Sequence, residues 1–518
     1  MQRTASSGAW WLNPSAAAVA SLPPAVVAVF ICVHQLTLHG VLHGIVIGNE
    51  SQNLGSAIAL TNGALPYANF PLASPPGMTI LMLPFAGLSH AVAPSVAMSL
   101  ARGATAATTV VAVYLAGFVA RFYGIPASIL AGVFTATYPV EFLSTAGVTT
   151  GPYVLAFSLL GLALAFPEGR LAEGRRMLYA GLCLGFACTI RPWAIIPTLV
   201  VLGCAAAASA RRSRLAPAIG GVLAGIVVPS VIFLADAPGA FWRDVVTTEL
   251  PGHGTMAAGA KLATVLGLGG AAGVSHPDGL AVTLAVIVMV AILLVALASA
   301  SYSSAYDWCI TITSIAVVAV AFLPGVMSPQ YGEFAFPLAG IGVGVSASRL
   351  LSLMAASGSG AGSDMRATLA RGVAVVLVAC GVVVAAVAAP ADGAFGARYA
   401  DEHGFIDTGA VTARIPPGAC AISNDAMVLI ASNRFAANGA TCPAAVDTNG
   451  LSAIEGDSRS GLLAASNVWL SWLSQARYVA ISSAGGSVSP TRIVFTDLHA
   501  NYVPIFSRAH LELVKRSR

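Results

Sequence analysis

Long apolar runs recur along this chain and limit what it can fold into. Runs of about 20 residues follow one another almost to Pro390, and each is long enough to cross a hydrocarbon core of about 30 Å as a helix. Of the 518 residues, 57% are hydrophobic and only 9% are charged, whereas roughly a quarter are charged in a soluble domain. The pattern predicts an α-helical polytopic membrane protein.

Prolines and glycines make two of the apolar stretches ambiguous. Pro84 and Pro94 interrupt the stretch 77–97, and glycines weaken 261–275. The first run has no cleavage site before residue 50, so we interpret it as a retained span. We predict roughly 11 to 13 spans, depending on these two stretches. The clearer spans are 20–46, 103–120, 125–141, 152–166, 177–190, 193–209, 215–235, 279–300, 308–324, 333–352 and 370–390.

Basic residues fall in alternate loops, which predicts the orientation. Arginines occupy the loops at 170–176, 211–214 and 366–371, and the positive-inside rule places these loops in the cytoplasm. The intervening loops, which carry Glu141 and Glu333, then face outward. The net charge of +4 is scattered and forms no basic patch, so we expect no nucleic-acid partner.

The C-terminal part differs in texture from the rest. From about residue 391 polar residues become frequent, and short apolar runs at 419–423 and 478–482 alternate with a helix-like segment at 460–474. This predicts a small α/β domain over 391–518, following a membrane domain over 1–390.

Two of the eight cysteines lie in this polar part. Cys420 and Cys442 form an isolated pair there, and the other six lie singly in apolar runs. The pair predicts a disulfide, and therefore an oxidising compartment outside the cytoplasm. We interpret the other six as small buried hydrophobic side chains.

The loop after the first apolar run contains a single charged residue. Glu50 is the only Asp, Glu, Lys or Arg between Arg3 and Arg102. Prolines downstream break the loop, and a short helix is expected over 51–61. Glu50 suits a general base that removes the proton of an acceptor hydroxyl. The alternative is a carboxylate at a helix end in the wet interface.

The loop resembles the first external loop of the GT-C glycosyltransferases, in particular bacterial members of the kind grouped in families 39 and 87. The similarity rests on NES at 49–51, ALPYANFP at 64–71 and SPPG at 74–77, and extends to GAFWRDVV at 239–246. The segment 416–450, with PGAC, ND, NRF, CP and VD in order, is similar to the C-terminal domain of these enzymes. The resemblance implies a substrate-binding loop at 49–76 that includes Tyr67 and Asn69.

Two acids are the candidate catalytic residues. Members of this superfamily usually place Asp where this chain has Glu50, so the resemblance carries the role over to a longer side chain. Glu141 closes a predicted span on the same side, and it either binds the acceptor or orients Glu50. A divalent metal between the two is the alternative, as in the metal-dependent branch of the superfamily. No D-x-D or D-x-E sequence stands here, so we favour a site without metal or other cofactor.

A lipid-phosphate donor needs cations, and few lie on the predicted outer side. Arg191 interrupts an apolar run at an outer turn, and a guanidinium fork suits a phosphate. The alternative is an arginine that reaches to the interface. Arg243 is a weaker candidate, and Arg102 either lies near the phosphate or anchors the cytoplasmic end of a span. The resemblance places Tyr331 near the carrier, although a tyrosine of the interfacial belt fits as well.

These inferences combine into one predicted function. The protein transfers a monosaccharide, with inversion, from a polyprenyl-phosphate donor to a glycan, glycolipid or protein on the outer face of a bacterial plasma membrane. The sequence does not give the sugar: the resemblance suggests mannose or arabinofuranose for envelope glycans, and equally hexosamine or glucose for lipid A or O-antigen. The alternatives are a transporter or lipid flippase, which would have the same spans, and an oligosaccharide ligase, which would use similar donor chemistry.

Overall fold

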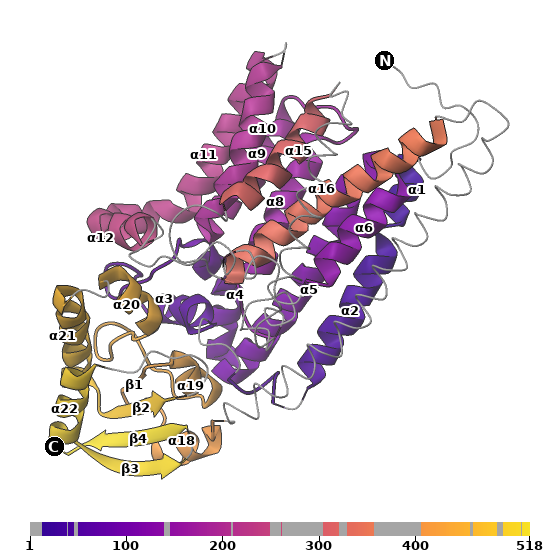
Figure 1. Cartoon of the computed structure of the whole chain (residues 1–518). Coiled ribbons are helices and arrows are strands. Elements are labelled where there is room, and N and C mark those ends of the chain that lie inside the picture. The colour runs from indigo at the N-terminus through magenta and orange to yellow at the C-terminus, as the bar shows by residue number, and fades with distance from the viewer. Residues whose placement is uncertain are drawn as a thin grey trace.

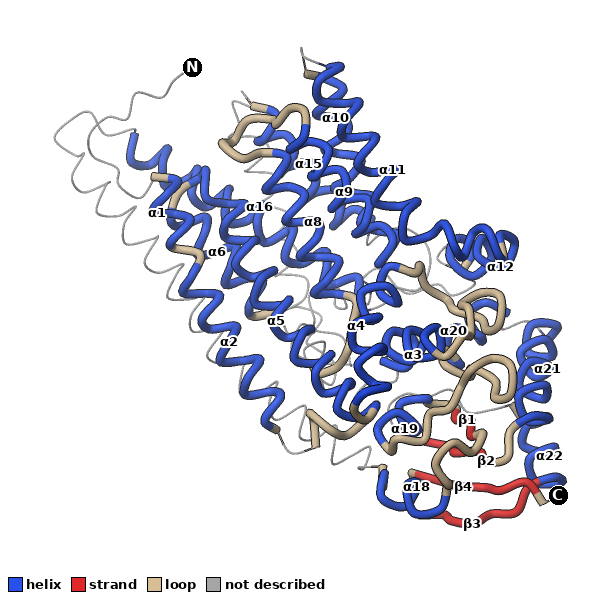
Figure 2. The backbone as a smooth tube through the Cα atoms, turned by 180° about the vertical axis from the view of Figure 1, so that it is seen from behind, coloured by secondary structure: helices blue, strands red, loops and turns tan. Residues whose placement is uncertain are grey.

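The chain forms a helical bundle with a small sheet-containing domain at one end. The structure is a computed structural model that describes residues 13–38, 40–45, 50–138, 146–208, 211–248, 261, 304–320, 329–356, 406–455, 459–483, 491–508 and 510–517. The C-terminal domain lies beneath the end of the bundle where α3 and the start of α5 are found (Figure 1). The view from behind shows the same arrangement (Figure 2).

The bundle consists of apolar helices. Three helical segments among the described residues are long and apolar enough to cross a membrane, namely Pro14–Thr37, Pro94–Tyr123 and Arg212–Asp236. The helices are α1 (Pro14–Val19), α2 (Leu22–Thr37), α3 (Ser56–Thr61), α4 (Gly77–Ala91), α5 (Pro94–Ala120), α6 (Ile125–Ala136), α8 (Gly151–Ala165), α9 (Arg175–Ile190), α10 (Ile195–Ala207), α11 (Arg211–Asp236), α12 (Pro238–Trp242), α15 (Ala305–Val320) and α16 (Pro329–Ala356).

Prolines and glycines set several helix boundaries. Pro94 opens α5 after the extended residue Ala93, because a proline disfavours helical backbone in the residue before it and fits the first helical position. Gly124 has a φ of 96°, which a glycine adopts without strain, and it separates a short 3-10 turn from α6. The chain reverses there, so α6 packs back against α5.

Small residues bring α9 and α11 into close contact. A Cβ on Gly181 or Gly185 would lie within 2.3 Å of a backbone oxygen of α11, and one on Gly221 or Gly225 within 2.5 Å of a backbone oxygen of α9. Two facing small-xxx-small patterns thus allow the backbones to touch, as is common between membrane helices.

The C-terminal domain is built on a four-stranded sheet. Its strands are β1 (Ala421–Ser423), β2 (Tyr478–Ser482), β3 (Tyr502–Arg508) and β4 (Leu511–Arg516), in the order β1-β2-β4-β3. β1 and β2 are parallel, whereas β4 is antiparallel to both of its neighbours. Side chains alternate between the faces along each strand. One face packs on α21 (Arg459–Gln475) and α22 (Arg492–Asn501), and the other on α18 (Thr408–Arg414) and α19 (Ala426–Ala431).

Helix α19 joins this domain to the bundle. All six of its residues are buried. Val428 and Leu429 face the sheet, whereas Met427 and Ile430 belong to the core of the bundle. A short helix that is apolar all round is therefore explained by its two partners. It also places the turn before it, Asn424-Asp425, against the first loop.

The first loop is folded and largely covered. A π-helical turn (Ser51–Gly55) runs into α3, so the expected helix over 51–61 is confirmed. Tyr67, at a φ of 67°, packs its ring edge-on against Phe233 and Phe241 of α11 and α12. Its hydroxyl donates to the carbonyl of Ser74 over 2.6 Å. These contacts hold the proline-broken segment in place.

The structure resolves one ambiguity and corrects some predicted boundaries. The ambiguous stretch 77–97 is divided, because α4 ends at Ala91 and α5 begins at Pro94. α5 therefore starts well before residue 103. Of the two alternatives for Arg102, the end of a span is excluded, because Arg102 lies inside this helix and pairs with Glu50. The first run ends at Thr37, not at residue 46. The predicted spans 279–300 and 370–390 and the boundary at 391 lie outside the described residues.

In the C-terminal domain the expected helix at 460–474 and the strands at 419–423 and 478–482 are confirmed. Strands β3 and β4 were not predicted. Their burial does not alternate regularly, and β3 is largely exposed, so the sequence shows no clear two-residue period there.

Candidate active site

A buried ion pair lies at the end of the bundle that faces the C-terminal domain. Glu50 begins the π-helical turn of the first loop, and Arg102 lies in the third turn of α5. The Arg102 Nε donates to Glu50 Oε1 over 2.8 Å, and Nη2 donates to Oε2 over 2.5 Å. Both side chains are fully buried. The guanidinium also donates through Nη1 to the Val41 carbonyl. The two charges are therefore held in one geometry, as a bidentate pair.

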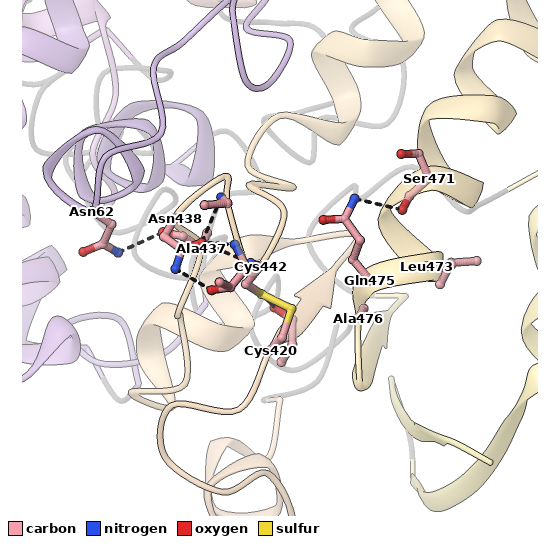
Figure 3. Close-up of a disulfide and its surroundings, with 12 residues drawn as sticks. Asn62, Cys420, Ala437, Asn438, Cys442, Ser471, Leu473, Gln475 and Ala476 are labelled. Atoms are coloured by element: carbon pink, nitrogen blue, oxygen red, sulfur yellow. Dashed lines mark hydrogen bonds between the residues drawn. A yellow bond between two sulfur atoms is a disulfide. The ribbon is translucent and has the colours of Figure 1, made fainter. Parts of the chain in front are cut away.

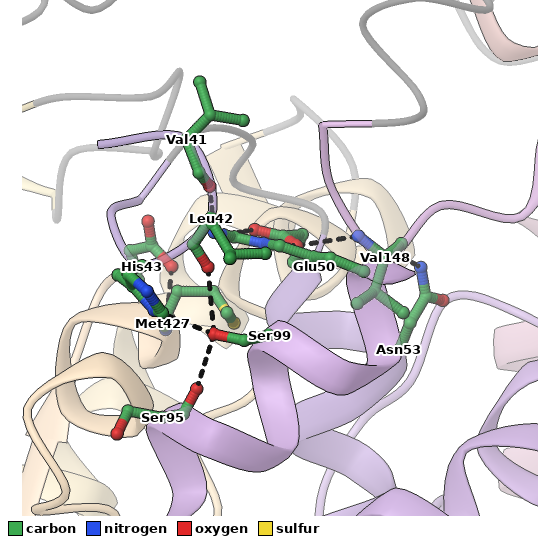
Figure 4. A network of polar contacts seen from close by, with 11 residues as sticks. Val41, Leu42, His43, Glu50, Asn53, Ser95, Ser99, Val148 and Met427 are labelled. Atoms are coloured by element: carbon green, nitrogen blue, oxygen red, sulfur yellow. Dashed lines mark hydrogen bonds and ion pairs between the residues drawn. The ribbon is translucent and has the colours of Figure 1, made fainter. Parts of the chain in front are cut away.

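The segment just before α8 supplies a third partner to this pair. The amide of Val148 donates to Glu50 Oε1 over 2.7 Å, and Asn53 of the first loop donates to the Val148 carbonyl over 2.7 Å. A Cβ on Gly147 would lie 3.1 Å from the Glu50 carboxyl carbon, so a glycine leaves room for the acid. Figure 4 shows Glu50, Val148 and Asn53 in this network. Glu50 is thus neither exposed nor in a wet interface.

Arg191 and Tyr331 form a second group nearby. The Arg191 Nε donates to Thr150 Oγ1 over 3.0 Å, and the guanidinium lies over the Trp193 ring. That ring packs edge-on against Tyr331, whose hydroxyl donates to the Val317 carbonyl. Arg191 is 8% exposed. The structure therefore brings Arg191 and Tyr331 together through one tryptophan.

The two groups are neighbours along the chain. Val148 binds Glu50 and Thr150 binds Arg191, so the contact points are two positions apart, or at most about 7 Å along the backbone. The carboxylate of Glu333 lies at the same place, because a Cβ on Gly151 would overlap it. Acidic and basic side chains from four parts of the chain thus converge around residues 147–151.

The C-terminal domain covers this region with Asp447. Its Oδ2 accepts from Gln52 over 3.0 Å and from the Ala73 amide over 2.8 Å, and its Oδ1 accepts from the Gly450 amide over 2.7 Å. Burial raises the pKa of Asp447, while these hydrogen bonds and the charge of Arg191 act in the opposite direction. Asp447 therefore fastens the domain to the first loop.

A second acid of the domain, Asp425, lies against the ion pair. It is 2% exposed, and its Oδ1 accepts from the Met427 amide over 3.0 Å at the start of α19. Burial raises the pKa of Asp425 to about 7, and the charge of Glu50 adds to this rise, whereas the amide of Met427 and the charge of Arg102 oppose it. Sequence reasoning did not single out Asp425 as a site residue, although ND at 424–425 belonged to the resemblance.

Other predicted site residues have local partners. Arg243 is half exposed and donates to Asp244 over 2.7 Å, with Glu455 at 4.0 Å. Asp244 in turn accepts from the Leu72 amide. Asn69 is exposed, and its Oδ1 accepts from the Leu65 amide over 2.7 Å. Arg243 thus lies beside the first loop and Asn69 lies within it, but both are outside the two buried groups.

The remaining site predictions concern Glu141, a metal site and the disulfide. Glu141 lies outside the described residues. No cluster of three His, Cys, Asp or Glu side chains suited to a metal occurs among the residues that the structure does describe. The predicted disulfide between Cys420 and Cys442 is present, with 5.2 Å between the Cα atoms (Figure 3). It lies beside the loop in which the Ala437 carbonyl accepts from Asn62 of the first loop.

An apolar groove lies on the bundle and has a volume of about 330 Å³. Tyr153 lines it, and the Tyr153 hydroxyl lies 3.3 Å from the hydroxyl of Thr105. Its lining comes from α4, α5 and α8, and includes Leu81, Thr108, Val111, Tyr153, Phe157 and Leu160.

Solved structures share this fold. ArnT from Cupriavidus metallidurans bound to undecaprenyl phosphate has a TM-score of 0.57 at 14% identity, over 96% of this chain and 97% of that chain. Its apo form has a TM-score of 0.56 at 13% identity, over 95% and 97%. The Archaeoglobus fulgidus oligosaccharyltransferase in complex with Zn and sulfate has a TM-score of 0.50 at 13% identity, over 89% of this chain and 68% of that chain.

No family model matches the chain, and no curated protein matches its sequence. At these identities the structural likeness establishes the fold, which is the GT-C fold of multi-pass membrane glycosyltransferases. The predicted fold class is therefore confirmed, including the small C-terminal α/β domain. Membership of family 39 or 87 stays a prediction.

Proposed function

We propose that this chain is a glycosyltransferase of the bacterial plasma membrane that takes a sugar from a polyprenyl-phosphate donor. It transfers the sugar to an acceptor hydroxyl on the outer face, in one displacement that inverts the anomeric carbon. The acceptor is a glycan, glycolipid or protein of the cell envelope. The fold is consistent with this chemistry, since ArnT, which shares it, was solved with undecaprenyl phosphate.

The observation that carries the proposal is that the apolar groove lies beside the residues that hold the two buried groups. Tyr153 lines the groove, and its hydroxyl lies 3.3 Å from that of Thr105. Thr105 lies three residues after Arg102 on α5, and Tyr153 three residues after Thr150, the partner of Arg191. Three residues of helix span about 4.5 Å. A lipid tail in the groove would therefore bring its phosphate close to Arg102 and Arg191 at once.

The donor's own chemistry limits what the protein must supply. A polyprenyl phosphate is already a good leaving group, so the site mainly needs positive charge at the phosphate and a base at the attacking hydroxyl. Arg191 is assigned to the phosphate, with Tyr331 and Arg102 beside it. Arg243 is already paired with Asp244, so it is assigned only an outer contact. No metal is assigned, so transfer is expected to be insensitive to EDTA.

Glu50 and Glu141 are assigned to the reacting end of the donor. Glu50 is charged and fixed by Arg102 and the Val148 amide, which makes it a stationary negative charge at the site. Glu141 precedes the segment that binds Glu50, and its assignment to the acceptor rests on that position alone. Tyr67 supports the loop that carries Glu50, and the exposed Asn69 is available to the acceptor.

Two features favour the outer face for this site. The disulfide Cys420–Cys442 belongs to the domain that covers it, and disulfides persist in oxidising compartments. Arg191 follows the end of α9 near the site, and the same helix begins at Arg175 in a basic loop. The basic loops therefore lie at the opposite end of the bundle. Arginines concentrated at the far end favour a cytoplasmic position for that end.

Transfer by the purified chain in lipid nanodiscs tests the proposal. Polyprenyl-phosphate sugars, with mannosyl and arabinofuranosyl donors first, and a lipid-linked oligosaccharide are offered with envelope acceptors. We expect the wild type to transfer a monosaccharide and Glu50→Gln to lose about 100-fold or more. The matched control is Glu173→Gln, which changes the same residue type in an exposed pair with Arg214.

The other outcomes are equally informative. Transfer of the oligosaccharide alone would identify a ligase. Movement of labelled donor across the bilayer without transfer would identify a transporter, and would contradict the proposal. A second variant tests the groove: Val111→Trp should raise the KM for donor with a smaller change in kcat, because the side chain fills the space assigned to the tail.

A further inference from the structure

Asp425 has a carboxylate oxygen that accepts no hydrogen bond from the residues that the structure describes. Its Oδ1 accepts from the Met427 amide, whereas Oδ2 is buried and has no partner. Buried polar atoms are nearly always hydrogen-bonded, so an exception calls for an explanation. An oxygen that is kept free in a buried position is suited to receive a proton from a bound molecule.

The position of Asp425 is fixed by the helix that follows it. α19 packs on the sheet on one side and on α5 and the first loop on the other, and these last two elements carry Arg102 and Glu50. The charges of both act on the Asp425 carboxyl. Asp425 is thus the acid that the C-terminal domain contributes beside the buried ion pair.

Two neighbouring acids differ from Asp425 in that their oxygens are occupied. Glu50 receives two hydrogen bonds from Arg102 and one from the Val148 amide. Asp447 receives hydrogen bonds at both oxygens from Gln52 and from two amides. A carboxylate paired with a guanidinium is a weak base, because protonation would break the pair. Of these three acids, Asp425 has the oxygen best able to accept a proton.

The pKa of Asp425 suits a group that accepts a proton. Burial is the largest cause of the rise of this pKa to about 7, and the charge of Glu50 adds to it, whereas the amide of Met427 and the charge of Arg102 oppose it. Strand β1 carries no titratable side chain, and β2 carries only Tyr478. On α18, Arg414 lies over the Phe506 ring. His43, which Figure 4 also draws, is hydrogen-bonded to Ser99.

We propose that Asp425 of the C-terminal domain is the catalytic base that removes the proton from the acceptor hydroxyl. The inference rests on the proposed transfer function, and it assigns to Asp425 the step for which the sequence predicted Glu50. The acceptor O–H bond breaks and the proton goes to Asp425 Oδ2. The acceptor oxygen forms a bond to the anomeric carbon, and the bond from that carbon to the phosphate oxygen breaks, with its electron pair leaving on the polyprenyl phosphate. Glu50 and Arg102 then hold the charges around the reaction without exchanging a proton.

Asp425→Asn tests the assignment because asparagine keeps the size and the capping ability of the side chain. We expect kcat to fall about 100-fold or more, with little change in the KM for donor. In the wild type, kcat/KM should rise about tenfold per pH unit up to a pH near 7 and then level, and this rise should be absent from the residual activity of the variant. The control is Asp407→Asn, since Asp407 caps α18 in the same way, with the Ala410 amide at 2.8 Å, but is exposed.

The outcomes separate this inference from the proposed function. A wild type that transfers no sugar from any donor refutes the function. A wild type that transfers sugar, with an Asp425→Asn variant that matches it in rate and pH profile, refutes only the role of Asp425. If the variant does not fold, the wild-type profile decides: a rate that is flat between pH 5 and 9 overturns the assignment, and a rise through pH 7 supports it.

Discussion

Two Glu–Arg pairs lie at opposite ends of the bundle, and they differ in almost everything except their chemistry. Glu50 and Arg102 are both fully buried, with 2.5 Å between Oε2 and Nη2. Glu173 and Arg214 approach to 2.7 Å, but the glutamate side chain is 51% exposed and the arginine 22%. The first pair is covered by the first loop and the C-terminal domain, whereas the second joins the loop before α9 to the start of α11 at the basic end of the bundle.

The difference shows that burial decides what such a pair contributes. Water screens the exposed pair, whose contribution is small. The buried pair loses its hydration, and this cost is offset only because every charged atom has a partner. Glu50 has the Val148 amide in addition to the fork, and Arg102 has the Val41 carbonyl. An arrangement that is costly to build and neutral in net stability is expected where a function needs charge inside the protein.

Breaking the buried pair should have the largest effect. Arg102→Met leaves Glu50 charged, buried and without its fork, so we expect a loss of about 3–5 kcal/mol in the free energy of unfolding. Arg214→Met, the same change in the exposed pair, should cost less than about 1 kcal/mol. Thermal unfolding of both variants in detergent compares them. Equal losses would show that burial does not distinguish the pairs.

The next effect concerns pH and the acid beside the buried pair. Asp425 has its pKa raised to about 7 by burial and by Glu50, so its stabilising contribution is complete below pH 4 and is lost as the pH rises through 7. A rise of roughly three units corresponds to at most about 4 kcal/mol. We expect the Asp425→Asn variant to have a higher free energy of unfolding than the wild type at pH 8, and a lower or equal one at pH 4.

The difference between the two proteins across pH isolates this one group, because Asp447 and the other acids titrate in both. Chemical unfolding of each at several pH values measures it. Parallel stability curves for the two proteins would mean that Asp425 has an ordinary pKa and would weaken its contrast with the exposed acids.

A smaller effect is expected where the domain holds the exposed start of α5. The side-chain oxygen of Asn433 accepts from the Ser95 amide over 2.9 Å, in the first turn of the helix that carries Arg102. Asn433→Ala should cost about 1 kcal/mol, as the loss of a cap does, and should reduce transfer by less than a change at Arg102. A loss as large as that of Arg102→Met in the same unfolding assay would show that docking of the domain, not the ion pair, dominates stability here.

Much of this architecture was accessible from the sequence because the physical signals are local. Apolar run lengths located most helices of the bundle, and Glu50 was singled out as the only charged residue between Arg3 and Arg102. The cysteine pair was visible because only two of the eight cysteines lie in polar sequence. Each of these features depends on residues that are close together in the chain or on composition.

The partners of these residues could not be predicted, since they are set by tertiary contacts. The sequence left Arg102 either near the phosphate or at the end of a span, because the acid that it pairs with lies 52 residues earlier. Asp447 meets Gln52 across 395 residues, and the free oxygen of Asp425 is evident only when the atoms around it are known. No periodicity or spacing encodes such pairings, although an acid directly after a buried strand is the kind of residue worth testing.

The smallest effect is predicted for the exposed pair itself. Glu173→Gln removes the acid from its contact with Arg214, and the arginine remains in water at the basic end of the bundle. We expect a change within about 0.5 kcal/mol in the free energy of unfolding, reduced further in 0.5 M salt because screening already weakens the pair. Transfer should be unchanged. Unfolding at low and high salt, with the transfer assay alongside, measures this, and a loss of transfer would mean that the two ends of the bundle are coupled through α8 and α9, which would remove the contrast between the two pairs.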